Sequence, residues 1–290
     1  MKASTIFSIK LLKIGIFVLL ICSSLTVCCQ SVLLPNGFAH NDYRHRHPLF
    51  DALGNGYTNF EADIFSVKNN LIVAHIDPFF KSGRTLENLY LRPLYQRVTC
   101  NGGEVYKGYN KPVILMIDIK TGAQKTYKAL MPLLEKYRPM LSSYDHGTIT
   151  PGAVTVVLSG HKPYKMIKGE ESRLAFIDED LRKAASDTVA DVYTMASCKY
   201  SKLVKWTGIG NMPDNQQKRL CAYVAAAHKY GEKVRLWASP ENYAVWQELL
   251  KCGVDLINTD KLVTLKDFLV YSHKTYANLG SVKPQSKSID

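Results

Sequence analysis

The 290-residue sequence predicts an α/β fold, more specifically a closed (β/α)8 or TIM barrel with a short insertion near residues 77–111. Apolar, β-rich runs alternate with segments of helical periodicity, which is typical of a parallel sheet. About eight such repeats fit into about 255 residues, the usual size of this barrel. Polar residues follow the apolar runs, as expected where strand ends build a site. An open, doubly wound sheet is the alternative.

Nine apolar runs are predicted as strands, and they are residues 36–41, 59–66, 71–76, 113–120, 153–159, 173–177, 191–196, 233–238 and 254–259. Strand side chains alternate between faces, so Glu61 and Asp63 point the same way, as do Asp118 and Lys120. Buried strands do not carry charges on their inward face unless those charges are paired or bind a metal. These four residues are therefore candidates for a functional site.

Six segments are predicted as helices, and they are residues 48–55, 123–138, 179–186, 214–231, 241–252 and 262–274. In residues 241–252 apolar positions recur at helical spacing, Pro240 stands before the start and Gly253 follows as a C-cap. Segment 77–111 breaks the alternation, because it has four glycines, several tyrosines and little periodicity. We expect it to form an excursion over one barrel end and to be a candidate substrate lid.

The N-terminus predicts export. Three lysines precede the apolar run of residues 14–22, which is too short to span a bilayer comfortably, and small residues follow it. We divide the chain into a signal peptide (1–29), a barrel domain (30–277) and a polar tail (278–290). Cleavage near Cys29 predicts a periplasmic or cell-surface protein. A lipoprotein modified at Cys28 or Cys29 and an uncleaved anchor are the alternatives.

The chain is basic, with a formal net charge of +12. The first 30 residues hold three lysines and no acid, so the remainder carries +9. One interpretation is a solvated surface, and the other is attraction to a phosphate substrate or peripheral contact with an anionic membrane. Nucleic acid is not an expected partner, because no recognised module or aromatic-basic repeat is present. Lysines contributing to the excess are Lys162, Lys165, Lys168, Lys199, Lys202 and Lys205.

Four cysteines remain after the predicted cleavage, and none stands in a Cys-x-x-Cys arrangement, which argues against a zinc site. They can pair in three ways, although buried free thiols are expected for most of them. These cysteines are Cys100, Cys198, Cys221 and Cys252.

Six residues at the ends of apolar runs supply the groups that a metal-assisted phosphodiester cleavage needs, and they are His40, Glu61, Asp63, His75, Asp118 and Lys120. Carboxylates bind a hard cation that clamps a phosphate oxygen, and two histidines transfer protons. Of the other polar residues, His45 and His47 are expected at the rim or surface. His161 follows the fourth strand and Asp260 follows the eighth, so both are expected at the active rim, and the alternative role of Asp260 is to cap the following helix.

These residues lie in stretches that resemble the phosphatidylinositol phospholipase C-like phosphodiesterase superfamily. The chain is most similar to glycerophosphodiester phosphodiesterases and their uncharacterised secreted bacterial relatives, over nearly all of the mature chain. The matching stretches are His40-Asn41-Asp42-Tyr43, residues 48–53 with Gly56, Glu61-Ala62-Asp63, residues 71–75, Ile117-Asp118-Ile119-Lys120, Val234-Arg235-Leu236-Trp237 and residues 253–260.

The resemblance implies roles for eight residues. The acid-base pair would be His40 and His75. The ligands of one divalent cation, Mg²⁺ or Ca²⁺, would be Glu61, Asp63 and Asp118. The substrate contacts would be Asn41, Lys120 and Trp237, with Lys120 neutralising phosphate charge.

Three departures leave the head group of the substrate open. Asn41 stands where glycerophosphodiesterases have Arg, and Pro48-Leu49 replaces a glutamate-asparagine pair. The third ligand is Asp118 rather than Glu, and the following Lys120 makes the set similar to the sphingomyelinase D branch.

The resemblance therefore implies a monomeric, metal-dependent phosphodiester hydrolase that acts on glycerophosphodiesters or phospholipid head groups by two-histidine acid-base catalysis. The attacking group is water or a hydroxyl of the substrate, which would give a cyclic phosphate first. The alternative function is a non-catalytic cell-surface barrel that binds lipid or glycan. A (β/α)8 glycosidase would leave both histidines and Lys120 without a role.

Overall fold

The computed structural model describes residues 32–68, 70–76, 83–184 and 192–280, with side chains up to residue 272. The chain divides into Met1–Val32 and a compact unit, Leu33–Asp290, which contains the barrel. The predicted signal peptide and residues 281–290 of the predicted tail lie outside the described residues. Among the described helices, none has the length and apolarity that crossing a membrane requires.

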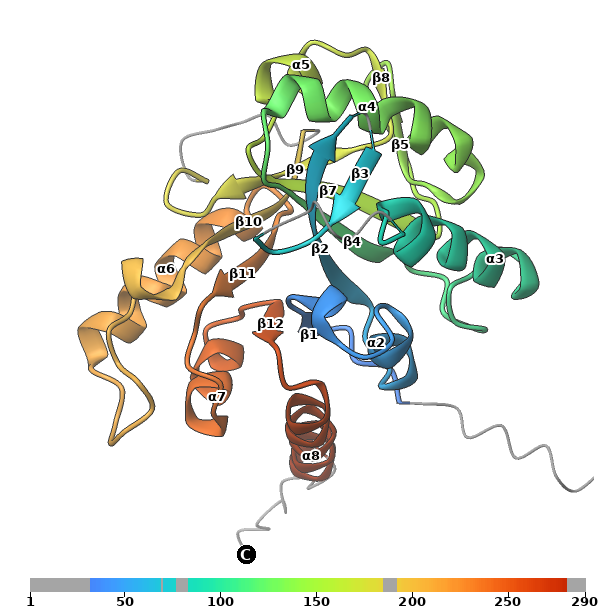
Figure 1. Ribbon diagram of the computed structural model, residues 1–290. Coiled ribbons are helices and arrows are strands. Elements are labelled where there is room, and N and C mark those ends of the chain that lie inside the picture. Colours follow the sequence, from blue (N-terminus) through green and yellow to red (C-terminus); the bar gives the residue numbers. More distant parts are fainter. Residues whose placement is uncertain (1–31, 69, 77–82, 185–191, 281–290) are drawn as a thin grey trace, which may run out of the picture. The chain divides into compact units, whose positions relative to one another are not determined.

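Eight parallel strands form a closed barrel in the ring order β1-β2-β4-β7-β9-β10-β11-β12 (Figure 1). The ring closes through pairing of Ala39 on β1 with Phe60 on β2. The predicted barrel is thereby confirmed over the open sheet. Its strands are β1 (Gly37–Ala39), β2 (Asn59–Val67), β4 (Val113–Ile119), β7 (Val154–Gly160), β9 (Phe176–Asp180), β10 (Tyr193–Lys199), β11 (Lys233–Trp237) and β12 (Leu256–Thr259).

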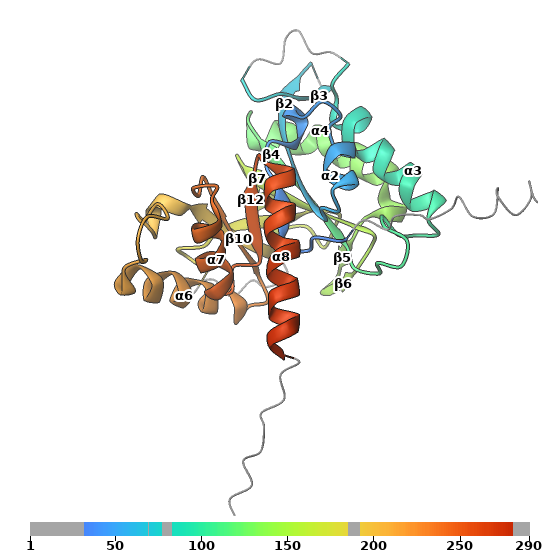
Figure 2. The same ribbon diagram turned by 90° about the horizontal axis from the view of Figure 1, so that it is seen from below.

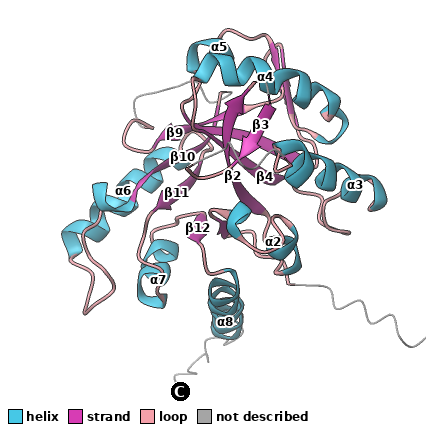
Figure 3. Cartoon of the chain, viewed as in Figure 1, coloured by secondary structure: helices cyan, strands magenta, loops and turns pink. Residues whose placement is uncertain are grey.

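Helices surround the strands (Figure 3). Helix α8, the long red helix in Figure 2, contacts β1. The Tyr57 hydroxyl donates to the Leu262 carbonyl at the start of this helix. The described helices are α2 (Phe50–Gly54), α3 (Arg92–Cys100), α4 (Ala123–Lys136), α5 (Tyr164–Lys168), α6 (Asp214–His228), α7 (Tyr243–Lys251) and α8 (Leu262–Gly280). A π-helical turn, Glu87–Leu91, leads into α3, and 3-10 turns cover Asp42–Arg44, Arg138–Met140 and Tyr200–Lys202.

Two smaller β elements lie outside the ring. Strand β3 (Asn70–Val73) pairs antiparallel with β2. The end of β3 therefore lies beside Ile64, close to the C-terminal mouth of the barrel. Strands β5 (Ser143–Asp145), β6 (Thr148–Thr150) and β8 (Ser172–Arg173) form a separate antiparallel sheet.

The barrel interior has two layers along its axis. An apolar cluster fills one level, and its members are Phe38, Ile114, Met116, Val157, Met195 and Leu256. Because side chains two residues apart share a face, continuing each strand toward its C-terminal end brings polar residues to the same interior. On β4 the inward series is Ile114, Met116 and Asp118. Strand alternation thus places the polar residues at the C-terminal mouth of the barrel.

All nine predicted strands and five of the predicted helices are present, with strand ends shifted by up to three residues. The helix predicted at 179–186 is wrong for its described part, because β9 runs to Asp180 and a turn covers Leu181–Ala184. Pairing of β9 with β10 fixes residues 178–180 in the sheet and overrides their local helical propensity.

The segment 77–111 holds more regular structure than its glycines suggested. Residues 77–82 lie outside the described residues, but Glu87–Cys100 is helical and buries Tyr90, Leu91 and Leu94 in the core. Helix α3 is thus the barrel helix that precedes β4. The expectation of mostly free thiols also needs correction, because Cys221 on α6 and Cys252 after α7 form a disulfide. Cys198 is a buried free thiol, and Cys100 is free but exposed.

Candidate active site

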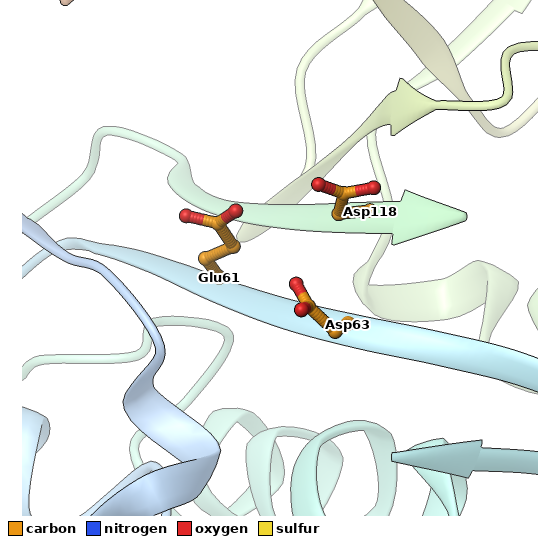
Figure 4. Close-up of side chains that lie close together, drawn as sticks. All are labelled: Glu61, Asp63 and Asp118. Atoms are coloured by element: carbon orange, nitrogen blue, oxygen red, sulfur yellow. The ribbon is translucent and has the colours of Figure 1, made fainter. Parts of the chain in front are cut away.

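Three carboxylates meet at the mouth of the barrel. Glu61 and Asp63 share one face of β2, and Asp118 lies on β4, where it is the register partner of Asp63. One oxygen from each of the three lies within 4.8 Å of the others. Figure 4 shows all three on the same side of the two strands. Like charges this close repel one another, so the group needs cations to stay ionised.

Two cationic side chains balance part of this charge. Lys120 Nζ lies 2.9 Å from Asp118 Oδ2 and 3.1 Å from Asp63 Oδ2. On the far side, Arg235 Nη2 lies 2.6 Å from Glu61 Oε2. Three carboxylates thus face two cationic groups, which leaves one negative charge in excess.

The pKa values of this cluster reflect burial and pairing together. Burial raises the pKa of the Glu61 carboxyl, and the charges of Arg235 and His40 only partly oppose this. Burial disfavours the charged form of Lys120, but its hydrogen bonds and attraction to Asp118 and Asp63 prevail and raise its pKa. Lys120 therefore remains a cation at neutral pH.

The residues present fit a hard divalent cation. Asp118 Oδ1 is buried and has no hydrogen-bond partner among the described residues. Beside it, Gly160 ends β7 with φ +68°, and a Cβ there would lie 2.0 Å from Asp118 Oδ1. Only glycine leaves room for this carboxylate. An unpartnered buried carboxylate oxygen is costly by itself, but with two neighbouring carboxylates it forms the oxygen donor set that Mg²⁺ and Ca²⁺ prefer.

The two histidines flank the carboxylates. His40 follows β1, and its Nδ1 lies 2.6 Å from Asp260 Oδ1 while its Nε2 lies 3.9 Å from Glu61 Oε2. His75 follows β3, and its Nδ1 lies 3.1 Å from Asp63 Oδ2. One imidazole is therefore near Glu61 and the other near Asp63.

A buried tyrosine links the two histidine sides. The Tyr43 hydroxyl is 2.7 Å from both Asn41 Oδ1 and Asp63 Oδ2, and 3.1 Å from His75 Nδ1. Burial and the neighbouring Asp63 charge raise the pKa of Tyr43 far above its ordinary value, so its hydroxyl stays protonated. Asn41 has a left-handed backbone, φ 48°, and its Nδ2 lies 2.9 Å from His40 Nδ1. The turn after β1 thus fixes both histidines.

Trp237 stands apart from this network. It ends β11, is 38% exposed, and has Lys199 Nζ 5.7 Å from its ring centroid. It lines a separate cavity at the same mouth, together with residues of β7, β9 and β10. The other seven residues singled out from the sequence share one contiguous set of hydrogen bonds and ion pairs.

Sequence reasoning missed two contacts. Asp260 contacts His40 rather than only capping a helix, and Arg235 reaches Glu61 across the barrel. Arg235 carried a signal, because a charged residue between the buried Val234 and Leu236 must find a partner. His161 Nδ1 lies 3.1 Å from the Thr121 carbonyl oxygen, and His47 pairs with Asp51, so neither contacts the carboxylates.

Comparison with protein families gives a match to the AIM6-like phosphodiesterase domain over residues 28–178. This segment holds His40, His75, the three carboxylates and Lys120, while Arg235, Trp237 and Asp260 lie beyond it.

Named relatives are fungal. "Altered inheritance of mitochondria protein 6" of Eremothecium gossypii is 31% identical over 265 residues, covering 79% of this chain and 68% of that protein. Its homolog in Arthroderma benhamiae is 24% identical over 259 residues, covering 79% of this chain and 82% of that one. These relatives do not support the expected bacterial branch.

Among solved structures, a glycerophosphodiester phosphodiesterase from Agrobacterium tumefaciens matches with a TM-score of 0.50. The two chains are 14% identical, and the match covers 82% of this chain and all of that one. At this identity the likeness shows the shared barrel fold.

Proposed function

Because the chain belongs to the family of AIM6-like phosphodiesterase domains, we propose that it is a metal-dependent phosphodiester hydrolase. One observation carries the proposal: three carboxylates, two histidines and a lysine converge at the C-terminal mouth of a (β/α)8 barrel. Barrel enzymes build their active sites at that mouth.

Glu61, Asp63 and Asp118 would hold one divalent cation, Mg²⁺ or Ca²⁺. When bound, such a cation supplies Lewis-acid stabilisation of the charge that builds on the phosphate oxygens. The excess negative charge of the cluster and the unpartnered Asp118 Oδ1 support this assignment.

The chain's own residues would move the protons and position the phosphate. His40 lies near Glu61 and His75 lies near Asp63, so one histidine would take the proton of the attacking hydroxyl while the other would protonate the leaving oxygen. Asp260 orients the His40 ring by contacting Nδ1, which directs Nε2 toward Glu61. Lys120 remains charged and would neutralise a phosphate oxygen.

The proposed substrates are phosphodiesters such as glycerophosphodiesters or phospholipid head groups. Asn41 supplies no positive charge where a glycerophosphodiesterase has Arg, so the second negative charge of a monoester would be poorly matched. Pure protein is expected to hydrolyse bis(p-nitrophenyl) phosphate faster than p-nitrophenyl phosphate in the presence of Mg²⁺ or Ca²⁺. Asp118→Asn is the matched inactive control. Faster turnover of the monoester would contradict the proposal.

The location of the enzyme is part of the same proposal. We propose a monomer exported by residues 1–29 into the periplasm or to the cell surface, with its basic charge favouring peripheral contact with anionic membranes. The secreted bacterial branch of the superfamily is part of this proposal as well. N-terminal sequencing of protein recovered from the expressing cells tests cleavage near Cys29, and an intact N-terminus on all of it would contradict export by a cleaved signal.

A further inference from the structure

A second pocket opens at the same barrel mouth, beside the carboxylate cluster. It has a volume of about 230 Å³, and its wall comes from the ends of β7, β9, β10 and β11 and the turns after them. Ser159 in this wall is the register partner of Asp118. The pocket is therefore one strand away from the proposed cation site. We call it the basic pocket, because Lys162, Arg182, Lys199 and Lys202 line it together with Trp237.

Two of the three lysines of the basic pocket, Lys199 and Lys202, are exposed, while the charge of the third, Lys162, acts on the Asp178 carboxyl. In the part of the chain that the structure describes, no carboxylate forms an ion pair with any of the three. Lys162 Nζ donates to the Asp178 carbonyl oxygen at 2.5 Å, and Lys199 lies over the Trp237 ring. Lys202 is exposed.

Both carboxylates of the pocket have hydrogen-bonding partners, but Asp178 Oδ1 is buried and has no partner among the described residues. Asp178 Oδ2 accepts from Ser197 Oγ at 2.5 Å and from Ser159 Oγ at 3.1 Å, within the barrel interior. Asp180 binds Arg182 through two hydrogen bonds, of 2.9 and 2.5 Å. The lining thus contains four cationic side chains, Lys162, Arg182, Lys199 and Lys202, against these two carboxylates. The pocket therefore presents positive charge in excess.

Resting on the proposed function, we infer that the basic pocket binds a negatively charged group on the head group of the phosphodiester substrate. The reacting phosphate would lie at Glu61, Asp63 and Asp118, and the second anion at Lys199 and Lys202, with Trp237 packing against the atoms between them. The substrate class is then a phosphodiester whose head group carries its own carboxylate or phosphate.

Two substrate pairs distinguish the sources of the anion. Glycerophosphoserine and glycerophosphoethanolamine differ only in a carboxylate, and glycerophosphoinositol 4-phosphate and glycerophosphoinositol differ only in a phosphate. We expect kcat/KM to favour the anionic member of at least one pair by about fivefold or more, because several exposed charges act together. This ratio should fall toward one in about 1 M salt, where charges are screened beyond about 3 Å.

Variants localise the effect. The double variant Lys199→Met/Lys202→Met is expected to bring the anionic-to-neutral ratio close to one, since both side chains are exposed and their removal leaves the core intact. Lys229→Met is the matched control, because Lys229 is an exposed lysine between α6 and β11, at the opposite end of the barrel. The control should keep the wild-type ratio. An equal fall in both variants would overturn the assignment of the pocket.

Failure of this inference is distinguishable from failure of the proposed function. If bis(p-nitrophenyl) phosphate is hydrolysed but neither pair shows an anionic preference, the pocket assignment is wrong and the phosphodiesterase assignment stands. If no diester is hydrolysed, the proposed function is wrong, and calorimetry still tests the pocket. Phosphoserine should then bind to the wild-type protein more tightly than phosphoethanolamine. The difference in affinity should be smaller for the double variant. Equal affinities would overturn the pocket.

Discussion

The two halves of the barrel mouth carry opposite charge. The ends of β1, β2 and β4 bring together buried carboxylates with one negative charge in excess. The ends of β7 and β10 present lysines that form no ion pair with a described carboxylate, beside the exposed Trp237 at the end of β11. Both halves arise from the same strand alternation, so neighbouring strand ends of one scaffold carry negative charge in excess on one side and positive charge in excess on the other.

Burial separates the halves as clearly as charge does. Glu61 and Asp63 are almost fully buried, whereas Lys199 and Lys202 are exposed. Removing a buried charge leaves its charged partners buried without compensation, which affects both chemistry and stability. Changing an exposed lysine removes only a screened interaction. We therefore expect the acidic half to control whether reaction occurs, and the basic half to control which substrate is preferred.

The largest expected effect is loss of the cation from the acidic half. EDTA should abolish diesterase activity, and added Mg²⁺ or Ca²⁺ should restore it, because the carboxylates are the proposed charged ligands. Activity assays with elemental analysis of the treated protein provide the measurement. Full turnover by protein shown to be metal-free would remove the cation from the mechanism and leave the acidic half a structural cluster.

The next largest effect is expected from replacing either of the two histidines. His40→Ala and His75→Ala should each lower kcat by roughly 10³-fold, because each removes a proton-transfer step. The double variant should be little worse than either single one, since the pair acts as a unit. The test is steady-state kinetics on a chromogenic diester. Near wild-type turnover in either single variant would show that the remaining histidine suffices.

Stability provides the third test of the acidic half. Asp42, in the turn after β1, is fully buried, and Leu49 N–H and the Tyr90 hydroxyl donate to its Oδ2. Burial raises its pKa from 3.8 to about 6, despite those hydrogen bonds. Since the folded pKa exceeds the unfolded one, the stability this group contributes is present below pH 3.8 and is lost as pH rises through about 6.

Asp42→Asn keeps an acceptor oxygen for both donors and removes the charge. The free energy of unfolding of the variant, relative to wild type, should therefore rise by about 2 kcal/mol between about pH 4 and about pH 7. Denaturant unfolding at both pH values measures this. Asp51→Asn is the control of opposite sign, because the hydrogen bond from His47 N–H lowers the pKa of Asp51. A pH-independent difference for Asp42→Asn would mean that Asp42 stays ionised at no cost.

Local signals explain why the acidic half was predictable from sequence. Glu61 and Asp63, like Asp118 and Lys120, stand two residues apart at the end of an apolar run, so period-two alternation alone places each pair on one face. The strand ends then bring the pairs together once a barrel is predicted. What each side chain contacts is a different question, because Asp260 and His40 are 220 residues apart, and Arg235 and Glu61 are 174 apart. No local pattern encodes such partners.

The basic half was less predictable for the same reason. Lys162, Lys199 and Lys202 were recognised as loop lysines, but only the ring order of β7, β9 and β10 brings them to one pocket. The incorrect helix at 179–186 falls in this half as well. Its charged residues favour a helix locally, but Glu179 pairs with Ala196 and Asp180 pairs with Ser197 in the sheet, which excludes a helix there. Tertiary contacts, rather than local propensity, determine this part of the molecule.

The smallest expected effect concerns Asp260, which acts through His40. Its partial burial opposes ionisation, but hydrogen bonds from His40 and Asn41 prevail and lower its pKa, so it is a carboxylate at neutral pH. Asp260→Asn should lower kcat by about 10- to 100-fold with little change in KM, because the ring orientation is lost while the substrate contacts remain.

A second aspartate–histidine pair provides the control for this last comparison. Asp255 Oδ2 lies 2.8 Å from His228 Nε2, just before β12 and therefore at the opposite end of the barrel from the mouth. Asp255→Asn removes an equivalent contact without touching the site, so kcat should stay at the wild-type value even if the melting temperature falls. Equal losses of kcat in the two variants would show that Asp260 has only a structural role. A loss confined to Asp260→Asn would identify it as the residue that positions His40.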